Sequence, residues 1–236
     1  MKLPVAILAG GLATRLRPLT EQTPKALIDV GGRPFIMRQL DLLRGHGAER
    51  VVLCVGHLGE MVQAAVGDGS AWGIDVRYIF DGGSLLGTGG AIRNALPLLG
   101  DSFFVLYGDS YLDCDYGAVE RAFLSGGKPA LMTVLRNEDR WDRSNVVFRD
   151  GRIVTYDKRD RTADMHHIDY GLGAFRAEVF AAYPAGAAID LAAVYQDLVR
   201  RGALAGFEVA ERFYEIGSPE GLEETRRYFA HRERAR

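Results

Sequence analysis

The first half of the chain alternates between short apolar runs and longer stretches in which apolar residues recur at helical spacing. The runs, which are typical of buried strands, lie at 5–8, 50–55, 75–80 and 103–107. Helices are predicted at 34–47, 58–66 and 89–99. Strand–helix units of this length predict an α/β fold with a mostly parallel sheet and helices on both faces, in a Rossmann-like three-layer αβα arrangement.

The pattern changes after about residue 128. Apolar runs predict strands at 130–135 and 167–175, and helical spacing returns at 191–202. Two alternating runs at 145–158 flank Asp150-Gly151, a pair typical of a type I′ hairpin turn. We expect this hairpin to be an insertion that walls one side of the carboxyl edge of the sheet.

The domain organisation is expected to be simple. The sequence contains no internal repeat and no low-complexity linker, so we expect one domain over 1–236, with a first half at 1–128 and a second half at 129–236. Near the end, Ser218 followed by Pro219 predicts the N-cap and first residue of a helix.

Composition narrows the class of protein. The 236 residues carry a formal net charge of -2, which argues against wholesale binding of nucleic acid or membranes through bulk charge. Two lone cysteines are typical of a reducing compartment. No apolar run approaches the roughly 18 residues of a membrane span, and the N-terminus lacks the features of a signal peptide. We therefore expect a cytoplasmic protein.

The loop after the first strand has the composition of a phosphate-binding site. Gly10 and Gly11 let backbone N–H groups approach a ligand closely, since neither has a Cβ atom. Arg15 and Lys25 add two cations suited to phosphate oxygens. Ligands of open α/β sheets bind outside the carboxyl ends of the strands, where this loop begins. The sequence here matches neither the P-loop nor the dinucleotide-binding glycine pattern.

Asp109 is the candidate metal ligand. It follows the apolar run 103–107, so its carboxylate should point into the crevice at the carboxyl edge. Mg²⁺ prefers one or two carboxylates together with waters and phosphate oxygens. A turn-capping role is the alternative for Asp109, and an N-cap role is an additional interpretation for Thr88.

Five segments together resemble one enzyme family. The string AGGLATRLRPLTEQTPKAL closely resembles the signature of the nucleotidyltransferases that make sugar nucleotides. Four further segments match in order: LLGTGGAI (85–92), YGDS (107–110), YDK (156–158) and FYEIGSPEGL (213–222). The short length and the GTGGAI pattern are most similar to manno-heptose 1-phosphate guanylyltransferases and their short uridylyl- and thymidylyltransferase relatives.

The resemblance implies a GT-A-like nucleotidyltransferase fold and a role for each matching residue. It implies that Arg15 contacts the triphosphate, that Lys25 lies near the α-phosphate, and that Mg²⁺ binds Asp109 and Glu215, where the family usually has a second Asp. The implied nucleotide-binding residues are Ala9, Gly10, Gly11, Thr14, Gly87 and Thr88. The implied sugar-phosphate-binding residues are Gly89, Asp157, Lys158, Asp169 and Gly171.

The implied reaction joins a nucleoside triphosphate and a sugar 1-phosphate, with a hexose or manno-heptose as the sugar, into a nucleotide sugar and pyrophosphate. Two alternatives stay open: a phosphocholine or phosphonate cytidylyltransferase, and a non-catalytic homologue that senses nucleotide sugars. The sequence leaves open the base, the sugar and the oligomeric state.

Overall fold

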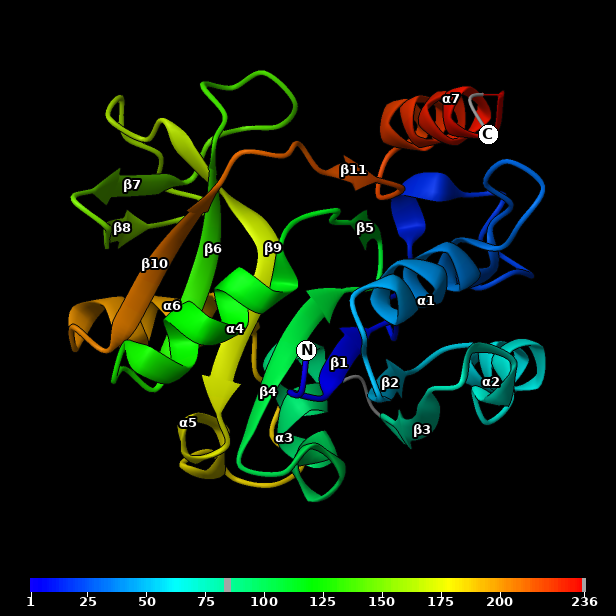
Figure 1. Cartoon of the computed structure of the whole chain (residues 1–236), viewed down its shortest axis with the longest axis horizontal. Helices are drawn as coiled ribbons and strands as arrows, with labels where there is room; N and C mark the ends of the chain where they lie inside the picture. Colours follow the sequence, from blue (N-terminus) through cyan, green and yellow to red (C-terminus); the bar gives the residue numbers. More distant parts are fainter. Residues whose placement is uncertain (83–85, 235–236) are drawn as a thin grey trace.

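Strands from both halves of the chain form one mixed sheet (Figure 1). The computed structural model describes residues 1–82 and 86–234. Within that part, nine strands belong to the sheet, in the order β10-β6-β9-β4-β1-β2-β3, with β7 and β8 attached beside β9. Their bounds are β1 Val5–Leu8, β2 Arg50–Val55, β3 Asp75–Phe80, β4 Ser102–Tyr107, β6 Ala130–Arg136, β7 Val146–Arg149, β8 Arg152–Tyr156, β9 His167–Arg176 and β10 Leu204–Val209.

Parallel pairing aligns the carboxyl ends of the central strands. β1 pairs parallel with β4 on one side and β2 on the other, and Leu8 at its end lies between Tyr107 and Cys54. β3 continues the parallel order beyond β2. β9 is antiparallel to both of its main neighbours, β4 and β6. The expected α/β fold with a mostly parallel, mixed sheet is confirmed.

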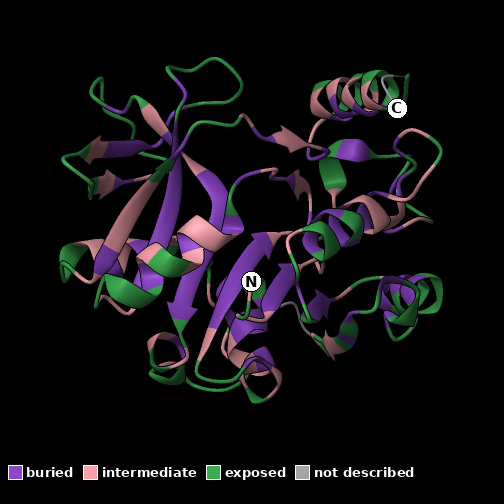
Figure 2. Cartoon of the chain, viewed as in Figure 1, coloured by how far each residue is buried: buried purple, intermediate pink, exposed green. Residues whose placement is uncertain are grey.

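Helices cover both faces of the sheet. Side chains on a strand alternate between the two faces, so neighbouring residues of β1 pack against different helices. Val5 and Ile7 pack with α1, α2 and α4, whereas Ala6 between them packs with α3, α5 and α6. The central strands are buried along most of their length (Figure 2). The helices are α1 Phe35–Gly45, α2 Gly59–Val66, α3 Gly87–Leu99, α4 Tyr116–Ser125, α5 Glu178–Ala181, α6 Leu191–Arg200 and α7 Pro219–Arg234.

The segment after β10 returns to the glycine loop, which is the loop that follows β1 and contains Gly10 and Gly11. Strand β11 (Tyr214–Glu215) pairs antiparallel with β5 (Ser110–Tyr111), just after β4. Helix α7 then packs beside α1 and the loop that follows β1 (Figure 1). Residues of a third apolar cluster bridge these segments: Leu16, Ile28, Val30, Phe35, Leu42, Tyr111, Ile216, Leu222 and Phe229. This packing brings residue 215 next to residue 110.

Two local predictions are confirmed and one is wrong. Asp150 and Gly151 have φ values of 50° and 72°, the positive values that a type I′ turn requires. Helix α7 begins at Pro219, and the Gly221 N–H donates to Ser218 Oγ at 3.0 Å, as expected of an N-cap. Thr88, however, is not an N-cap of α3, because that helix already begins at Gly87.

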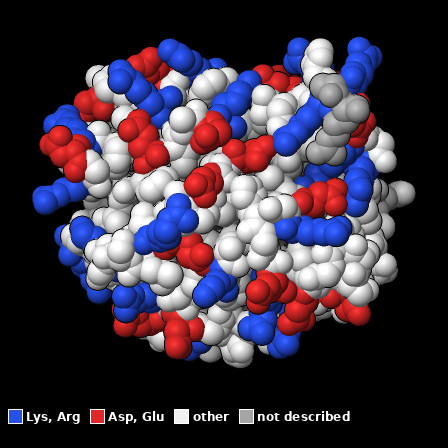
Figure 3. All heavy atoms as spheres, in the orientation of Figure 1, with Lys and Arg blue, Asp and Glu red and all other residues white. Residues whose placement is uncertain are grey.

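The surface carries mixed charge. Acidic and basic side chains are interspersed over the face shown in Figure 3, in keeping with the small net charge. Across residues 1–82 and 86–234, no helix is both long enough and apolar enough to cross a membrane.

Candidate functional site

Two adjoining cavities lie at the carboxyl edge of the sheet. The glycine-loop cavity, of about 240 Å³, is lined by Leu8, Ala9, Gly10, Gly11, Lys25, Ala26, Cys54, Asp81, Gly87, Thr88, Ala91, Tyr107, Gly108 and Asp109. The hairpin cavity, of about 550 Å³, is lined by Arg15, Tyr107, Asp109, Ser110, Trp141, Asp142, Arg143, Asn145, Lys158, Ile168, Asp169, Tyr170, Gly171, Phe213, Glu215 and Ser218. Tyr107 and Asp109 line both cavities, so these two residues form a common wall.

Close backbone packing shapes the floor of the glycine-loop cavity. A Cβ atom on Gly10 would lie 3.1 Å from the Gly56 nitrogen and 3.2 Å from Asp81 Oδ2, so a larger residue would press into the neighbouring strand end. On Gly11 a Cβ atom would meet nothing within 4 Å. The backbone of the loop is therefore tightly packed at Gly10 and exposed at Gly11.

Asp109 lies in the common wall and is paired with Lys25. Lys25 Nζ donates to Asp109 Oδ2 at 2.8 Å, and the two side chains are only 20% and 28% exposed. Burial alone would raise the pKa of Asp109, but the charge and hydrogen bond of Lys25 outweigh it and hold the pKa below its ordinary value. The carboxylate is therefore ionised at neutral pH and available to bind a cation.

Three charged side chains converge on Gly217. A Cβ atom on this glycine would lie 2.6 Å from Glu215 Oε2, 3.1 Å from Arg15 Nη2 and 3.2 Å from Asp109 Oδ2. The backbone supports this arrangement, because the Ile216 N–H donates to the Asp109 carbonyl at 2.9 Å. Glu215 also accepts hydrogen bonds from the Gly217 N–H and from Ser218 Oγ, the latter at 2.7 Å. The start of α7 thus fixes Glu215 next to Asp109.

The pair of carboxylates fits a divalent cation that also binds phosphate. Among the described residues no group of three or more His, Cys, Asp or Glu side chains forms a complete metal cage. Mg²⁺ does not need one, since it takes one or two carboxylates and fills its other positions with waters and phosphate oxygens. Asp109 and Glu215, facing a gap kept free by a glycine, have the donor chemistry for such an ion.

Lys158, two residues beyond the end of β8, lines the hairpin cavity. Its Nζ lies 3.6 Å from Asp169 Oδ2 and 5.0 Å from the centre of the Tyr107 ring. Asp169 is almost fully buried, and the Tyr156 hydroxyl is 3.3 Å from its Oδ2. Gly171, with a φ of 103°, lines the same cavity. The hairpin therefore supplies a cation on the far side of the common wall from the glycine loop.

Most of the predicted site residues line one of the two cavities, but three do not. Thr14 is exposed at the start of a 3-10 turn. The Gly89 N–H donates to the Ile189 carbonyl at 2.8 Å, so this glycine serves the packing of α3. Asp157 accepts hydrogen bonds from the N–H groups of Arg159 and Asp160 at 2.7 and 2.9 Å, which fix a turn.

Thr88 lines the glycine-loop cavity and also ties two helices together. Its Oγ1 accepts the Leu191 N–H at 2.8 Å, at the start of α6. This contact satisfies a backbone N–H at the start of α6, more than 100 residues away along the chain. The sequence around Thr88 contains no information about α6, so it predicted a cap for α3 instead.

Sequence reasoning did not single out Asp81, Tyr107 or Asn145. Asp81 directly follows β3, and Asp109 lies two residues beyond the end of β4. The argument about strand ends that identified Asp109 would therefore also have identified Asp81. Tyr107 is the last residue of β4 and lies inside a motif that was noted for its aspartate. The Asn145 side chain accepts the Asp169 N–H at 2.9 Å, a contact between distant segments that no local pattern signals.

Known proteins share both the sequence pattern and the fold. The family model described as Nucleotidyl transferase matches residues 5–145. The chain is 31% identical to N-acetylmuramate alpha-1-phosphate uridylyltransferase of Neisseria meningitidis over 90% of its own length and 92% of the relative's. It is 30% identical to UTP--glucose-1-phosphate uridylyltransferase of Synechocystis over 78% of its own length, but spans only 52% of that longer protein.

A solved structure confirms the fold. HddC from Yersinia pseudotuberculosis, complexed with GMP-PN, superposes with a TM-score of 0.82 at 24% identity and covers 96% of this chain and 99% of its own. The region that the family model matches, residues 5–145, contains the glycine loop, Lys25 and Asp109. On this evidence the chain belongs to the nucleotidyl transferase family.

Proposed function

We propose that this nucleotidyltransferase joins a nucleoside triphosphate to a sugar 1-phosphate, releasing pyrophosphate and a nucleotide sugar. The observation that carries the proposal is the common wall between the two cavities. One cavity has the glycine loop, the other has Lys158 and Asp169, and both open onto Asp109. Two separate reactants can therefore meet at one carboxylate.

The chemistry requires alignment and charge neutralisation more than proton transfer. A phosphate monoester has a second pKa of about 6, so the acceptor is largely dianionic at neutral pH. One of its oxygens attacks the α-phosphorus, and the bond from that phosphorus to the β-phosphate oxygen breaks. Pyrophosphate leaves with the bonding electrons, and no protein nucleophile or general base takes part. The barrier arises from bringing two polyanions together.

The cations of the site have separate tasks in this proposal. Lys25 faces the donor cavity, Lys158 faces the acceptor cavity, and Arg15 lies beside the carboxylates near Gly217. Mg²⁺ held by Asp109 and Glu215 would supply further neutralisation of phosphate charge. Lys158 would hold the phosphate of the acceptor, and the buried Asp169 would accept hydrogen bonds from sugar hydroxyls.

The test is pyrophosphate release in a matrix of nucleoside triphosphates against hexose and heptose 1-phosphates, with phosphocholine as a further acceptor. We expect turnover with at least one sugar 1-phosphate and none with phosphocholine. Turnover with phosphocholine alone would replace the proposal with a cytidylyltransferase. Nucleotide binding without any pyrophosphate release would favour a non-catalytic sensor.

Asp109→Asn tests the role of the common wall. Loss of the carboxylate charge should reduce kcat by at least about 100-fold, the scale of losing one electrostatic stabiliser in a water-excluded site. Circular dichroism should show an unchanged fold. Asp115→Asn is the matched control, since Asp115 caps α4, lines neither cavity, and asparagine caps as well. Wild-type kcat in Asp109→Asn would contradict the proposed role.

A further inference from the structure

The buried face of α1 carries one polar side chain, that of Gln39. Helix α1 lies wholly within the described part of the chain, and the other side chains that it buries are apolar: Phe35, Ile36, Leu40, Leu42 and Leu43. Gln39 is only 1% exposed. A buried amide costs stability unless hydrogen bonds replace its contacts with water. Its hydrogen-bond partners should therefore show what the amide does there.

The amide of Gln39 binds the turn that carries Asp109. Its Nε2 donates to the Tyr107 carbonyl at 3.1 Å and to the Ser110 carbonyl at 2.8 Å, so the two hydrogen bonds lie on either side of Asp109 along the chain. Two carbonyl oxygens need a donor, which fixes the end of the amide that faces them. Oε1 is buried and has no hydrogen-bond partner among the described residues. Since an unpartnered buried oxygen is destabilising, packing alone does not favour glutamine at this position.

Backbone contacts hold the rest of the turn at 107–110. The Gly108 N–H donates to the Leu8 carbonyl at 3.0 Å, and the Ile216 N–H donates to the Asp109 carbonyl at 2.9 Å. A Cβ atom on Gly108 would lie 2.4 Å from the Leu8 oxygen, so the turn fits closely against the end of β1. Within residues 1–82 and 86–234, Gln39 is the only residue whose side chain donates to a backbone carbonyl of this turn. Its contribution can therefore be removed by a substitution outside the turn.

The same turn also determines where Glu215 lies. Strand β5 begins at Ser110 and pairs antiparallel with β11, so that Ser110 lies opposite Glu215. The hydrogen bond from Gln39 to the Ser110 carbonyl thus holds the strand beside which Glu215 is placed. The Asp109 and Glu215 carboxylates come from segments more than 100 residues apart, and both approach the gap at Gly217. A shift of the turn would change the separation of these two carboxylates.

We propose that Gln39 positions Asp109 and Glu215 for a divalent cation. Gln39 touches neither the carboxylates nor the reactants, and acts by holding the carbonyls on both sides of Asp109. Mg²⁺ demands near-ideal octahedral geometry, so its binding is sensitive to the separation of two carboxylates. Residues that orient metal ligands contribute about 10- to 100-fold to metal affinity or activity. The inference rests on the proposed function for the role of the cation, and goes beyond it by assigning a task to Gln39.

The decisive experiment replaces Gln39 with methionine, which has a similar length and no hydrogen-bond donor. Mn²⁺, a paramagnetic substitute for Mg²⁺, is titrated into the protein without nucleotide, and the free ion is measured by electron paramagnetic resonance. In Gln39→Met the Kd for Mn²⁺ should rise by about 10- to 100-fold, as should the Mg²⁺ concentration that half-saturates pyrophosphate release. The KM for the sugar 1-phosphate should change little, because no described hydrogen bond links Gln39 to Lys158 or Asp169.

Three further variants separate positioning from a loss of stability. Gln39→His keeps a single N–H donor, so its Kd for Mn²⁺ should lie between those of the wild type and Gln39→Met. Ile36→Val removes a buried methylene group from the same helix without touching the turn. It should lower the thermal midpoint and leave the Kd for Mn²⁺ unchanged. Asp109→Asn should abolish Mn²⁺ binding, which assigns the signal to this site.

The outcomes distinguish a failure of this inference from a failure of the proposed function. A wild-type Kd for Mn²⁺ in Gln39→Met overturns the inference, as does an equal rise in Ile36→Val, because lost stability would then account for both. Mn²⁺ binding that survives in Asp109→Asn overturns it too, as does a wild type that binds no Mn²⁺. Conversely, the expected order of Mn²⁺ affinities in a protein that releases no pyrophosphate supports positioning and contradicts catalysis. If Gln39→Met does not fold, Gln39→His decides the question, since a wild-type Kd in that variant overturns the inference.

Discussion

At the scale of single residues, the candidate site depends on glycines that keep space free around Glu215. A Cβ atom on Gly221 would lie only 1.6 Å from Glu215 Oε1, and one on Gly217 would meet the ends of Glu215, Arg15 and Asp109. Both glycines lie in the described part of the chain, and neither has a positive φ. Space, and not backbone conformation, is therefore what these positions require.

Gly217→Ala should disturb the site while preserving the fold. The added methyl group would push the ends of the three charged side chains apart, and a misplacement of about 1 Å can cost about 100-fold in rate. We expect kcat/KM for pyrophosphate release to fall by about 10- to 100-fold, with a nearly unchanged thermal midpoint. Gly45→Ala is the control, since a Cβ atom there meets nothing within 4 Å. Full activity of Gly217→Ala would show that the gap at Gly217 is not used.

At this scale, sequence motifs identified residues that line the cavities, although the contacts of those residues join distant parts of the chain. Lys25, Asp109, Lys158 and Glu215 all line the cavities, as the motifs suggested. Gly89 does not, because its N–H is taken by Ile189, a residue 100 positions away. A motif identifies a residue type in a loop, but it does not reveal which distant segment has already used its hydrogen-bonding groups.

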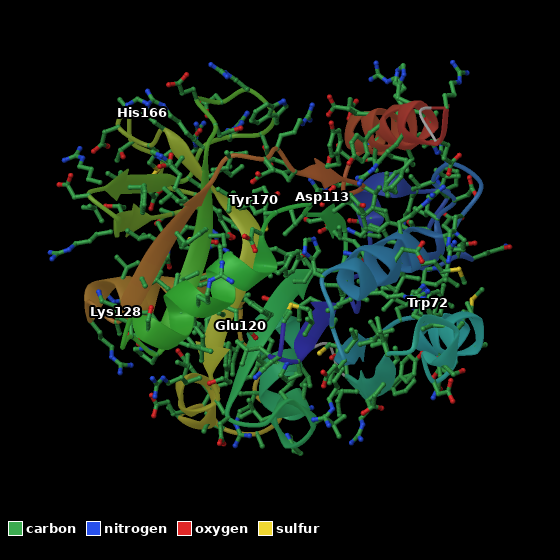
Figure 4. The ribbon with its side chains drawn as sticks, viewed as in Figure 1. Trp72, Asp113, Glu120, Lys128, His166 and Tyr170 are labelled. Carbon is green, nitrogen blue, oxygen red and sulfur yellow. The ribbon has the colours of Figure 1, made fainter. Side chains whose placement is uncertain are left out.

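At the scale of secondary structure elements, α7 is anchored at both ends. Its first turn holds Glu215 through Ser218, and near its other end Arg232 Nη1 donates to Asp113 Oδ2 at 2.8 Å. Asp113 follows β5, and Figure 4 shows it in the region between β5, α1 and α7. Within the described residues the helix continues to Arg234, and Asp113 engages its basic end through Arg232.

The Asp113–Arg232 pair makes the docking of α7 sensitive to pH. His46, 3.8 Å away, and the Arg232 guanidinium hold the pKa of Asp113 below its ordinary value. A lowered pKa in the folded state adds stability above the unfolded value of about 3.9 and loses it as the pH falls through the folded value.

Asp113→Asn should therefore lower the free energy of unfolding at neutral pH, by up to about 1 kcal/mol because the pair is partly exposed and screened. Urea titrations should show this difference shrinking as the pH falls below about 4. Added salt should reduce it too. Asp115→Asn serves as the control. A difference that persists unchanged in acid would mean that the asparagine perturbs packing and not charge.

Sequence patterns predicted the longer elements and missed the shortest. Apolar runs matched β1, β2 and β3 residue for residue. Strands β1 and β2 are buried and almost entirely apolar, whereas the edge strand β3 is partly exposed and includes Asp75 and Arg77. β5 and β11 have two residues each, too few for any periodicity. The antiparallel direction of β9 was also not predicted, because side-chain alternation is the same in both directions.

At the scale of the whole molecule, the continuous sheet links the two halves of the chain. β4 of the first half pairs with β9 of the second from Ser102 opposite Arg176 to Leu106 opposite Leu172. The hairpin cavity takes residues from both halves, including Asp109 and Lys158. We therefore keep the prediction of one domain over residues 1–236.

The two tryptophans provide a direct test of that prediction. Trp72 is buried in the first half, and Trp141 packs against Phe213 in the second. The tryptophan fluorescence of Trp72→Phe comes from Trp141 and reports on the second half. The fluorescence of Trp141→Phe comes from Trp72 and reports on the first half. The urea midpoints of the two variants should coincide with the loss of helix followed by circular dichroism. Separate midpoints within one variant would show that the halves unfold independently.

The wall that Tyr107 and Asp109 share between the cavities also suggests how such a molecule could be inhibited. A compound that crosses this wall occupies both cavities with one loss of translational and rotational freedom, whereas two separate ligands pay that entropic penalty twice. Tethering a nucleoside to a sugar mimic through an uncharged bridge would also avoid the repulsion between two anions. Such a bisubstrate analogue should bind more tightly than its two halves would suggest.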